Sequence, residues 1–251
     1  AAAIWSCPAS RMLEFPLSSF VTFCRNHGLL QVFDRPQWRT VKGGGRMYVN
    51  KLAAGIGEIH LGQAVETLRP RGGKIELISG SVSGVYDQVV LACHSDQSHP
   101  ILAAHYPTRT WPLKQMTYQP NRAVLHSDAS VLPRRKSLWS AWNYQSGDGM
   151  LSERPVAVHY LINRLQPLPT ETPVIVTLNP LREPDPARVH GEFHYSHPVF
   201  ARNATLLQRQ IASGNGRDGI WLAGAWLGYG FHEDGLASAL RVARQLDAAA
   251  P

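Results

Sequence analysis

The sequence has 251 residues, which suit one large domain or two ordinary ones and are enough to bury a sizeable core. Hydrophobic residues make up 44% and charged residues 17%, and the 21 Gly and 18 Pro stay below the low-complexity range, so a disordered, collagen-like or coiled-coil chain is excluded. Lys and Arg outnumber Asp and Glu by 25 to 18, a net charge of +7, but most basic residues are scattered singly, and we expect no nucleic-acid partner.

We expect neither a membrane span nor a targeting segment. The longest uncharged stretch, residues 220–231, is too short and too rich in glycine to cross a hydrocarbon layer that needs ~20 apolar residues. Cys7, Cys24 and Cys93 lack metal-ligand spacing and leave an odd thiol, which favours free thiols in a reducing compartment. The chain opens with alanines and carries no basic leader. We therefore predict a cytoplasmic location.

The first hundred residues change from helical to β-type patterning. Apolar residues at helical spacing predict a helix over 16–27 that Gly28 ends, and the turn Gly43-Gly44-Gly45 precedes a second helix over 46–54. Short β-type runs follow at 58–61, 64–69, 74–79 and 85–93, with Gly72-Gly73 as a hairpin turn. The continuous apolar run 89–92 predicts a strand buried on both faces.

The rest of the chain divides into a β-rich stretch and a mixed C-terminal segment. Strands predicted over 122–126, 137–144, 156–163 and 174–178 would form a largely antiparallel sheet. A helix over 200–213, a buried strand over 220–223 and a last helix follow. The expected buried face of that helix comprises Leu236, Ala239, Leu240, Ala243 and Leu246, with Ser238, Arg241 and Gln245 on the other face.

Three segments resemble ligand-binding motifs, but we do not interpret them as binding sites. The G-x-G-x-x-G at 214–219 follows a helix and enters a strand, the reverse of a dinucleotide fingerprint, so we interpret it as a turn. The histidines of 190–197 lie in a segment that Gly191 and Pro198 make extended, and we predict no metal site there. Arg134-Arg135-Lys136 is interpreted as a solvated loop in preference to a phosphate or lipid-headgroup clamp.

The segment 219–237 gives the most information about function. A buried strand ends at Gly224, a loop of glycines and aromatics follows, and a helix begins with Asp234 as N-cap and Gly235 in its first turn. Free N–H groups at a helix start favour a docked anionic group, and Gly235 would let that group approach the backbone. The alternative is a buried loop with packing aromatics.

This segment resembles the C-terminal signature of flavin-containing amine oxidases and phytoene-desaturase-like enzymes. More narrowly, the chain is similar to the predicted NAD/FAD-binding proteins of bacteria. The segments that carry this second resemblance are 26–30, 35–41, 89–97, 132–135, 139–144 and 228–236.

The resemblance implies an α/β fold in two parts. One is a discontinuous FAD/NAD(P)-binding, Rossmann-like domain formed by residues 37–100 and 201–251, and lacking its N-terminal βαβ unit. The other is an α+β substrate domain on a mainly antiparallel sheet, formed by 101–200 together with a helix and loop over 1–36. The phosphate-binding glycines of the family's N-terminal unit are missing from the 251 residues, so the chain looks like a C-terminal portion that does not hold FAD tightly by itself.

The resemblance also assigns roles to residues. The helix at Gly235 would point its N-terminus at the flavin N1 and C2 carbonyl. The residues assigned to FAD binding are Val65, Gly224, Ala225, Trp226, Gly230, Phe231, Asp234, Gly235 and Leu236. The substrate-side candidates are His232, Arg46, Met47 and Tyr144, of which His232 serves as a cavity wall, a hydrogen-bonding group or a base.

The implied function is that of an FAD-dependent oxidoreductase, which transfers a hydride from a small organic substrate to flavin N5. Ala225 and Trp226 stand where amine oxidases usually carry an acidic residue, which weakens the case for amine substrates. One alternative is a flavin-dependent desaturase or isomerase acting on a lipid or isoprenoid, with an anionic headgroup near Arg46 or Arg134. Another is a non-catalytic binding protein, if the chain natively starts at Ala1.

Overall fold

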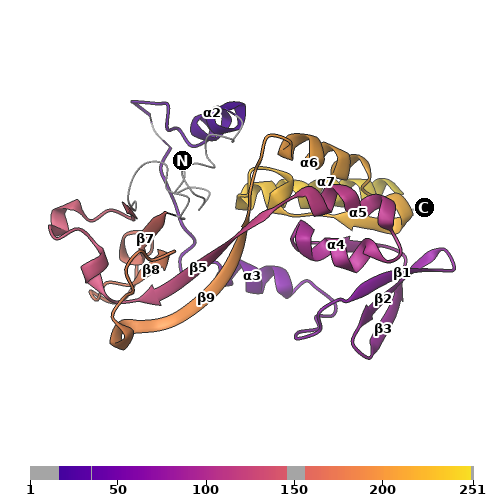
Figure 1. Ribbon diagram of the computed structural model, residues 1–251, viewed down its shortest axis with the longest axis horizontal. Coiled ribbons are helices and arrows are strands. Elements are labelled where there is room, and N and C mark those ends of the chain that lie inside the picture. Colours follow the sequence, from indigo (N-terminus) through magenta and orange to yellow (C-terminus); the bar gives the residue numbers. More distant parts are fainter. Residues whose placement is uncertain (1–16, 35, 146–155, 250–251) are drawn as a thin grey trace. The chain divides into compact units, whose positions relative to one another are not determined.

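Two units make up the chain in the computed structural model, which describes residues 17–34, 36–145 and 156–249 (Figure 1). The first unit contains the described residues up to Ile59 together with Gln119–His197, and the second contains His60–Tyr118 and the residues from Pro198 onward. This division differs from the predicted boundaries: residues 37–59 join the first unit, and 101–118 join the second because Ile101, Leu102 and Leu113 belong to its core.

The first unit is built on an antiparallel sheet, as predicted. Its strand order is β6-β7-β8-β5-β9, and β6 with β7, β7 with β8 and β8 with β5 are antiparallel pairs. The bounds are β5 Tyr118–His126, β6 Trp142–Gln145, β7 Ala157–Leu161, β8 Ile175–Leu178 and β9 Val189–Pro198. The extended segment expected near His190 is therefore β9. The strand predicted over 137–144 begins only at Trp142, because Lys136–Leu138 forms a 3-10 turn.

The two predicted N-terminal helices are confirmed as α2 Leu17–Asn26 and α3 Arg46–Ala53. Gly28 ends α2 in the left-handed region, at a φ of 63°. A Cβ there would lie 2.5 Å from the ring of Pro36. Both the positive φ and the lack of space therefore require glycine in this turn.

A chain of buried hydrogen bonds crosses the first unit's sheet. The Asp128 N–H donates to His126 Nδ1 (3.1 Å), so His126 carries its proton on Nε2 and donates it to Thr177 Oγ1 (2.7 Å). The Thr177 hydroxyl then donates to His159 Nδ1 (2.8 Å), and His159 Nε2–H donates to Gln145 Oε1 (3.1 Å). This series of hydrogen bonds fixes the position of each proton. It is possible only if the imidazoles of His126 and His159 are both neutral.

Burial supports that neutral state. His126 and His159 are 0% and 2% exposed, and burial lowers the pKa of both. The pKa of His159 falls to about 4, with smaller contributions from His126 and Arg182. For His126, Asp128 opposes the lowering and His190 adds to it.

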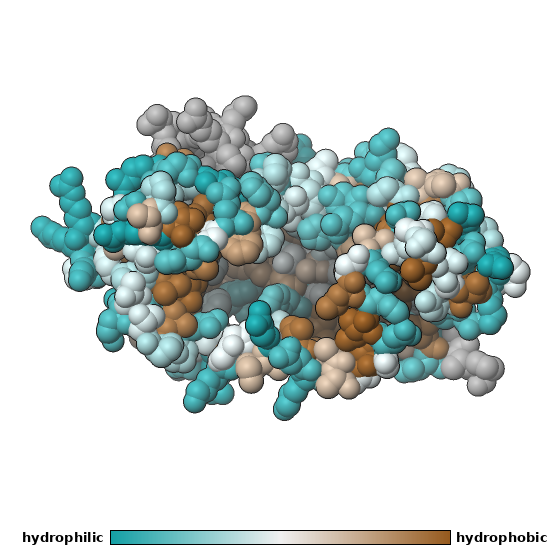
Figure 2. All heavy atoms as spheres, turned by 90° about the horizontal axis from the view of Figure 1, so that it is seen from below, coloured by the Kyte–Doolittle hydropathy of each residue, from teal (hydrophilic) through white to brown (hydrophobic). Residues whose placement is uncertain are grey.

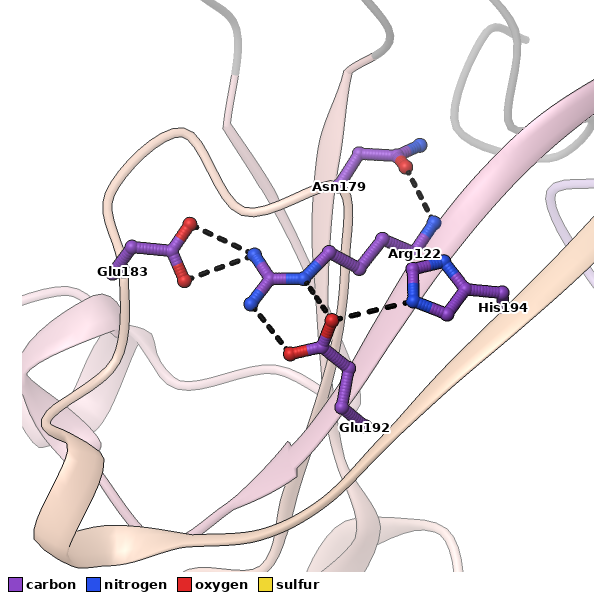
Figure 3. A network of polar contacts seen from close by, with 5 residues as sticks. All are labelled: Arg122, Asn179, Glu183, Glu192 and His194. Atoms are coloured by element: carbon purple, nitrogen blue, oxygen red, sulfur yellow. Dashed lines mark hydrogen bonds and ion pairs between the residues drawn. The ribbon is translucent and has the colours of Figure 1, made fainter.

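A second polar network joins β5 to the edge strand β9 of the same sheet (Figure 3). The Arg122 guanidinium on β5 donates two hydrogen bonds of 2.7 Å to Glu192 on β9 and bonds of 2.8 and 2.9 Å to Glu183. The Arg122 backbone N–H donates to Asn179 Oδ1 (3.1 Å), and His194 approaches Glu192 at 3.4 Å. Hydrogen bonds from Arg122 to both glutamates raise the pKa of this guanidinium, which keeps its charge between the two carboxylates.

The second unit combines a three-stranded meander, a parallel strand pair and four helices. Strands β1 Thr67–Arg71, β2 Lys74–Ser79 and β3 Val82–Tyr86 are antiparallel neighbours, and β4 Val89–Leu91 pairs in parallel with β10 Ile220–Leu222. The helices are α4 Ser95–Ala103, α5 Pro107–Gln115, α6 Ala204–Ser213 and α7 His232–Ala249. Helices α4 and α5 are not predicted from the sequence, since each contains an internal proline, Pro100 and Pro112, that weakens the helical signal.

Several strand predictions in this unit need correction. Residues 58–61 form no strand, the run predicted over 64–69 starts only at Thr67, and the run over 85–93 is divided into β3 and β4 by a bend at Asp87. Val90 is 43% exposed whereas Val89 and Leu91 are buried, so β4 is covered on one face and not on both.

The predicted buried face of α7 is wrong except at Leu246. Ser238 and Val242 are 2% and 3% exposed, whereas Leu236 and Leu240 are 53% and 45% exposed. The helix packs through Gly235 and Ser238 against the loop after β10, which leaves Leu236 and Leu240 exposed, whereas Leu246 packs against Trp221, Ala223 and Val242. Figure 2 shows exposed apolar patches among hydrophilic residues on one face of the molecule.

Acid is expected to destabilise the first unit through His159. Its pKa is about 4 in the folded chain and ~6.5 when unfolded, so the unfolded state binds the proton first as pH falls. Above the pKa of the unfolded state, the free energy of unfolding should keep its full value. It should fall by on the order of 2–3 kcal/mol as the pH drops from there to the His159 pKa of the folded chain. Denaturant unfolding across this range measures it.

His159→Gln keeps a hydrogen-bonding side chain without a titrating proton and should flatten that pH profile. His105→Gln, an exposed histidine of the second unit, is the matched control. An equal slope in wild type and His159→Gln would contradict the assignment.

Candidate functional site

The carboxyl ends of β4 and β10 form the centre of the candidate site. Leu91 pairs with Leu222, and the Ala223 N–H donates to Leu91 O (3.0 Å), so both strands end at the same edge. The segments that follow, beginning at Ala92 and Ala223, therefore leave the sheet side by side. In open α/β sheets this edge is where ligands bind.

Trp226 joins these two strand ends. Its side chain is 2% exposed, and its indole N–H donates to the Cys93 carbonyl (3.0 Å). A Cβ on Gly224 would lie 2.5 Å from the indole nitrogen, so only glycine at 224 lets the ring fold back over the strand end. Trp226 is thus a structural bridge whose ring faces the core, rather than an exposed wall.

The loop after Gly224 is held rigidly. The amides of Gly228 and Gly230 both donate to Ala225 O (3.0 and 3.1 Å). Gln208 on α6 donates through Nε2 to the carbonyls of Trp226 and Gly228 (3.0 and 2.7 Å). Nothing in the sequence pattern singled out Gln208, because its partners are backbone carbonyls about twenty positions away.

The start of α7 differs from the prediction. The helix begins at His232, and the Asp234 carboxylate accepts the Phe231 N–H (2.9 Å) from the helix's third position, so Asp234 is not the N-cap. The Gly235 N–H donates to Phe231 O (3.2 Å) and is already used by the helix. The amides that precede the first helical hydrogen bond belong to His232, Glu233 and Asp234.

Gly235 of α7 lies beside the loop after β10, with room for a Cβ at ordinary van der Waals contact. A Cβ on it would lie 3.7 Å from the Ala225 nitrogen and 3.9 Å from the Ala225 Cβ. One turn on, the Ser238 hydroxyl accepts the Gly224 N–H (2.9 Å) and donates to Gly235 O (2.7 Å). Ser238 was assigned to the outer face by periodicity, and its position three residues after Gly235 is the signal that could have found it.

A cavity of about 740 Å³ opens beside β4. Val65, predicted to bind cofactor, lines it, as do Cys93 and the exposed Val90. The remaining lining residues are Ala64, Glu66, Leu91, Ala92, Gln97, Pro100 and Ile101. The walls are mainly apolar, with one carboxylate and one amide, which suits an uncharged ring better than a phosphate.

The other predicted residues lie as follows. Gly230 and Leu236 are exposed, Phe231 is half-buried, and His232 is exposed in the first turn of α7. Arg46 and Met47 start α3, and Tyr144 lies on β6, so these three belong to the first unit. Met47 and Tyr144 are 55% and 53% exposed.

The glycine-rich run 214–219 is a turn between α6 and β10, as predicted. Gly216 has a φ of 80°, and a Cβ there would lie 2.5 Å from the Trp221 ring. The Arg109 guanidinium donates to the carbonyls of Gly214, Arg217 and Ile220 at 2.7 to 3.1 Å. A turn that presents carbonyls to a cation is the opposite of a phosphate-binding loop.

In the ranges that the structure describes, no three His, Cys, Asp or Glu side chains come together to hold a metal ion. His190, His194 and His197 have separate neighbours in Ser127, Glu192 and Asn121. No helix among the described residues is long and apolar enough to cross a membrane. Cys24 and Cys93 are free thiols, and Cys7 lies outside the described residues.

No protein-family model and no curated protein matches the chain. Solved structures share its fold at low identity. The "putative protoporphyrinogen oxidase" of Exiguobacterium sp. 255-15 has 13% identity and a TM-score of 0.58 over 92% of this chain and 58% of that chain. Cyclohexylamine oxidase of Brevibacterium oxydans IH-35A has 13% identity and a TM-score of 0.60 over 98% and 63%.

The CLA-producing fatty acid isomerase of P. acnes has 14% identity and a TM-score of 0.56 over 80% of this chain and 52% of that chain. The chain thus spans less than two thirds of each of these three proteins. The mixed α/β fold with antiparallel sheets resembles that of two oxidases and an isomerase, and at these identities the likeness concerns the fold.

Gly224→Ala is expected to destabilise the second unit by about 1–3 kcal/mol, because the new methyl group overlaps the Trp226 indole and cannot be accommodated without moving it. Gly57→Ala, where nothing lies within 4 Å, is the control and should change stability by less than about 1 kcal/mol. Denaturant unfolding followed by tryptophan fluorescence compares them. Equal stability of the two variants would show that Trp226 does not need this glycine.

Proposed function

We propose that this chain forms part of an FAD-dependent, amine-oxidase-like oxidoreductase. The observation that carries the proposal is the parallel pair β4–β10, whose ends lead on one side into the cavity at Val65 and on the other, through the rigid loop 224–231, into α7. The names of the three structural neighbours, two oxidases and an isomerase, support it.

The residues present fit two of the three parts of FAD. The apolar cavity beside β4 suits the adenosine, with Val65 and Ile101 on its walls. The amides of His232, Glu233 and Asp234 at the start of α7 favour the anionic form of a flavin ring. The glycine turn 214–219 does not suit the pyrophosphate, because its carbonyls face Arg109.

A further βα segment is proposed to supply the pyrophosphate site. Leu91 O bonds to β10, so Val90 directs its backbone groups to the opposite edge of β4, next to the cavity. A parallel pair of two short strands is a small sheet, and parallel sheets are normally covered on both faces. A strand added at Val90 and a glycine-led helix after it would complete both the sheet and the anion site.

FAD, when bound, would accept the substrate's hydride at N5. The exposed His232 in the first turn of α7 is proposed to line the substrate side and to hydrogen-bond the substrate. Arg46, Met47 and Tyr144 are proposed as substrate-side groups contributed by the first unit.

An apolar substrate is favoured by the surface around Tyr144. Trp142 and Tyr144 lie on one face of β6, about half exposed, and Trp142 packs edge-on against Tyr160 with ring centroids 5.3 Å apart. Such an aromatic face offers apolar contact to a hydrocarbon substrate. A flavin-dependent desaturase or isomerase acting on a lipid or isoprenoid is therefore the second candidate function.

The 251-residue chain should bind FAD weakly, since the proposed pyrophosphate site lies on the additional segment. A protein that also carries this segment should retain flavin through gel filtration, measured by its visible absorbance. Stoichiometric flavin on the 251 residues alone would overturn the need for the segment. Absence of flavin from both proteins would instead favour a non-catalytic binding protein.

Gly235→Val should lower flavin affinity at least tenfold, about 1.4 kcal/mol, in the protein that carries the segment. The Cβ of valine would already reach van der Waals contact with Ala225, so its two methyl groups need further room at the start of α7. Ala239→Val, on the exposed face of the same helix, introduces the same side chain away from Ala225 and should leave affinity unchanged. Equal flavin content in the two folded variants would remove α7 from the cofactor site.

A further inference from the structure

The segment between β5 and β6 presents a strongly basic surface in the first unit. Residues 133–138, which we call the basic loop, are all exposed, and three of them are the consecutive cations Arg134, Arg135 and Lys136. Leu138 is 61% exposed beside them. The loop belongs to the pink part of the ribbon in Figure 1.

The basic loop is fixed at both ends. Leu132 before it is buried in a cluster with Leu161 and Ile175. Trp139 after it donates its indole N–H to Pro133 O (2.8 Å), which closes the loop on itself. The 3-10 turn Lys136–Leu138 lies within this closure. The cations are therefore displayed by an ordered loop, so less conformational entropy is lost when a partner binds.

The positive charge of the loop is not neutralised. Among the described residues, no ion pair involves any of the three cations. Asp128 is the acidic residue before the loop, and its carboxylate already accepts the Ser130 and Asp185 amides. By contrast, Arg122 in the same unit holds two glutamates.

The sequence pattern alone favours a solvated loop, but on the order and the unpaired charge of this segment we propose that the basic loop binds the surface of an anionic phospholipid bilayer. Each basic residue near such a surface contributes about 1 kcal/mol, and an apolar side chain that enters the interface supplies the second signal that peripheral binding needs. Leu138 provides that side chain. Half-buried Trp139 packs against the cluster of Leu132 and donates its indole N–H to Pro133 O, so it holds the loop in place.

The same geometry argues against single-stranded nucleic acid as the partner. Such binding uses open aromatic faces on which bases stack. The face of Trp139 is covered by the Lys136 ammonium group, 5.7 Å from the ring centroid. The proposal rests on the first unit alone and is independent of any flavin chemistry in the second.

Vesicle co-sedimentation tests the proposal with the full chain. Phosphatidylcholine vesicles are compared with vesicles of equal parts phosphatidylcholine and phosphatidylglycerol. Binding is expected to the anionic vesicles only and to fall as salt is raised, because counterions screen the attraction. The triple variant Arg134→Gln, Arg135→Gln, Lys136→Gln should lose on the order of a hundredfold in partitioning.

The matched control removes the same charge elsewhere. Arg209, Arg241 and Arg244 are exposed on α6 and α7, and their triple replacement by Gln should retain most of the binding. Leu138→Ser should weaken partitioning by about tenfold or less and leave the salt dependence unchanged.

Three results would overturn the proposal. The first is an equal loss of vesicle binding in the two triple variants, which would indicate an effect of net charge alone. The second is the absence of binding to anionic vesicles at low salt. The third is full displacement of the protein from the vesicles by inorganic phosphate at matched ionic strength. The last would identify an anion site in place of a membrane surface.

Discussion

The hydrogen bond from the Trp226 indole to the Cys93 carbonyl is the constraint on which the second unit depends. It joins residues 133 positions apart at the ends of β4 and β10, where the segments to the cavity and to α7 diverge. Because the ring folds back against Gly224, the loop that follows has one course, and Gln208 holds that course through two carbonyls. The position of α7 relative to the strand ends follows from this bridge and from Ser238.

The first unit handles its polar groups differently. Its buried histidines are kept neutral by a one-directional chain of hydrogen bonds through Thr177, whereas the half-exposed Arg122 keeps its charge between two glutamates. The difference follows from burial, since an imidazole can shed its charge in a dry sheet and a guanidinium cannot. Neutral hydrogen-bonding groups therefore stabilise the centre of the sheet, and charged groups attach β9 to it.

The glycine residues show how context changes the meaning of a pattern. Gly214, Gly216 and Gly219 spell a dinucleotide fingerprint, yet their turn offers carbonyls to Arg109. Gly235 is expected to clear space for a ligand, and a Cβ there would lie at ordinary van der Waals contact with Ala225, 3.7 to 3.9 Å away. In both cases the groups that surround the glycine depend on residues distant in sequence.

The sequence by itself determined the local elements with strong signals: α2 and its stop at Gly28, the Gly72-Gly73 hairpin, most strands of the antiparallel sheet, and the strand, loop and helix order of 219–249. These depend on spacing and turn chemistry between near neighbours. The tertiary structure decided which face of α7 is buried, that Val90 lies open, that α4 and α5 are helices despite Pro100 and Pro112, and that Gln208 and Ser238 hold the site. Those outcomes depend on packing and hydrogen bonds between segments far apart in the chain, which no local pattern encodes.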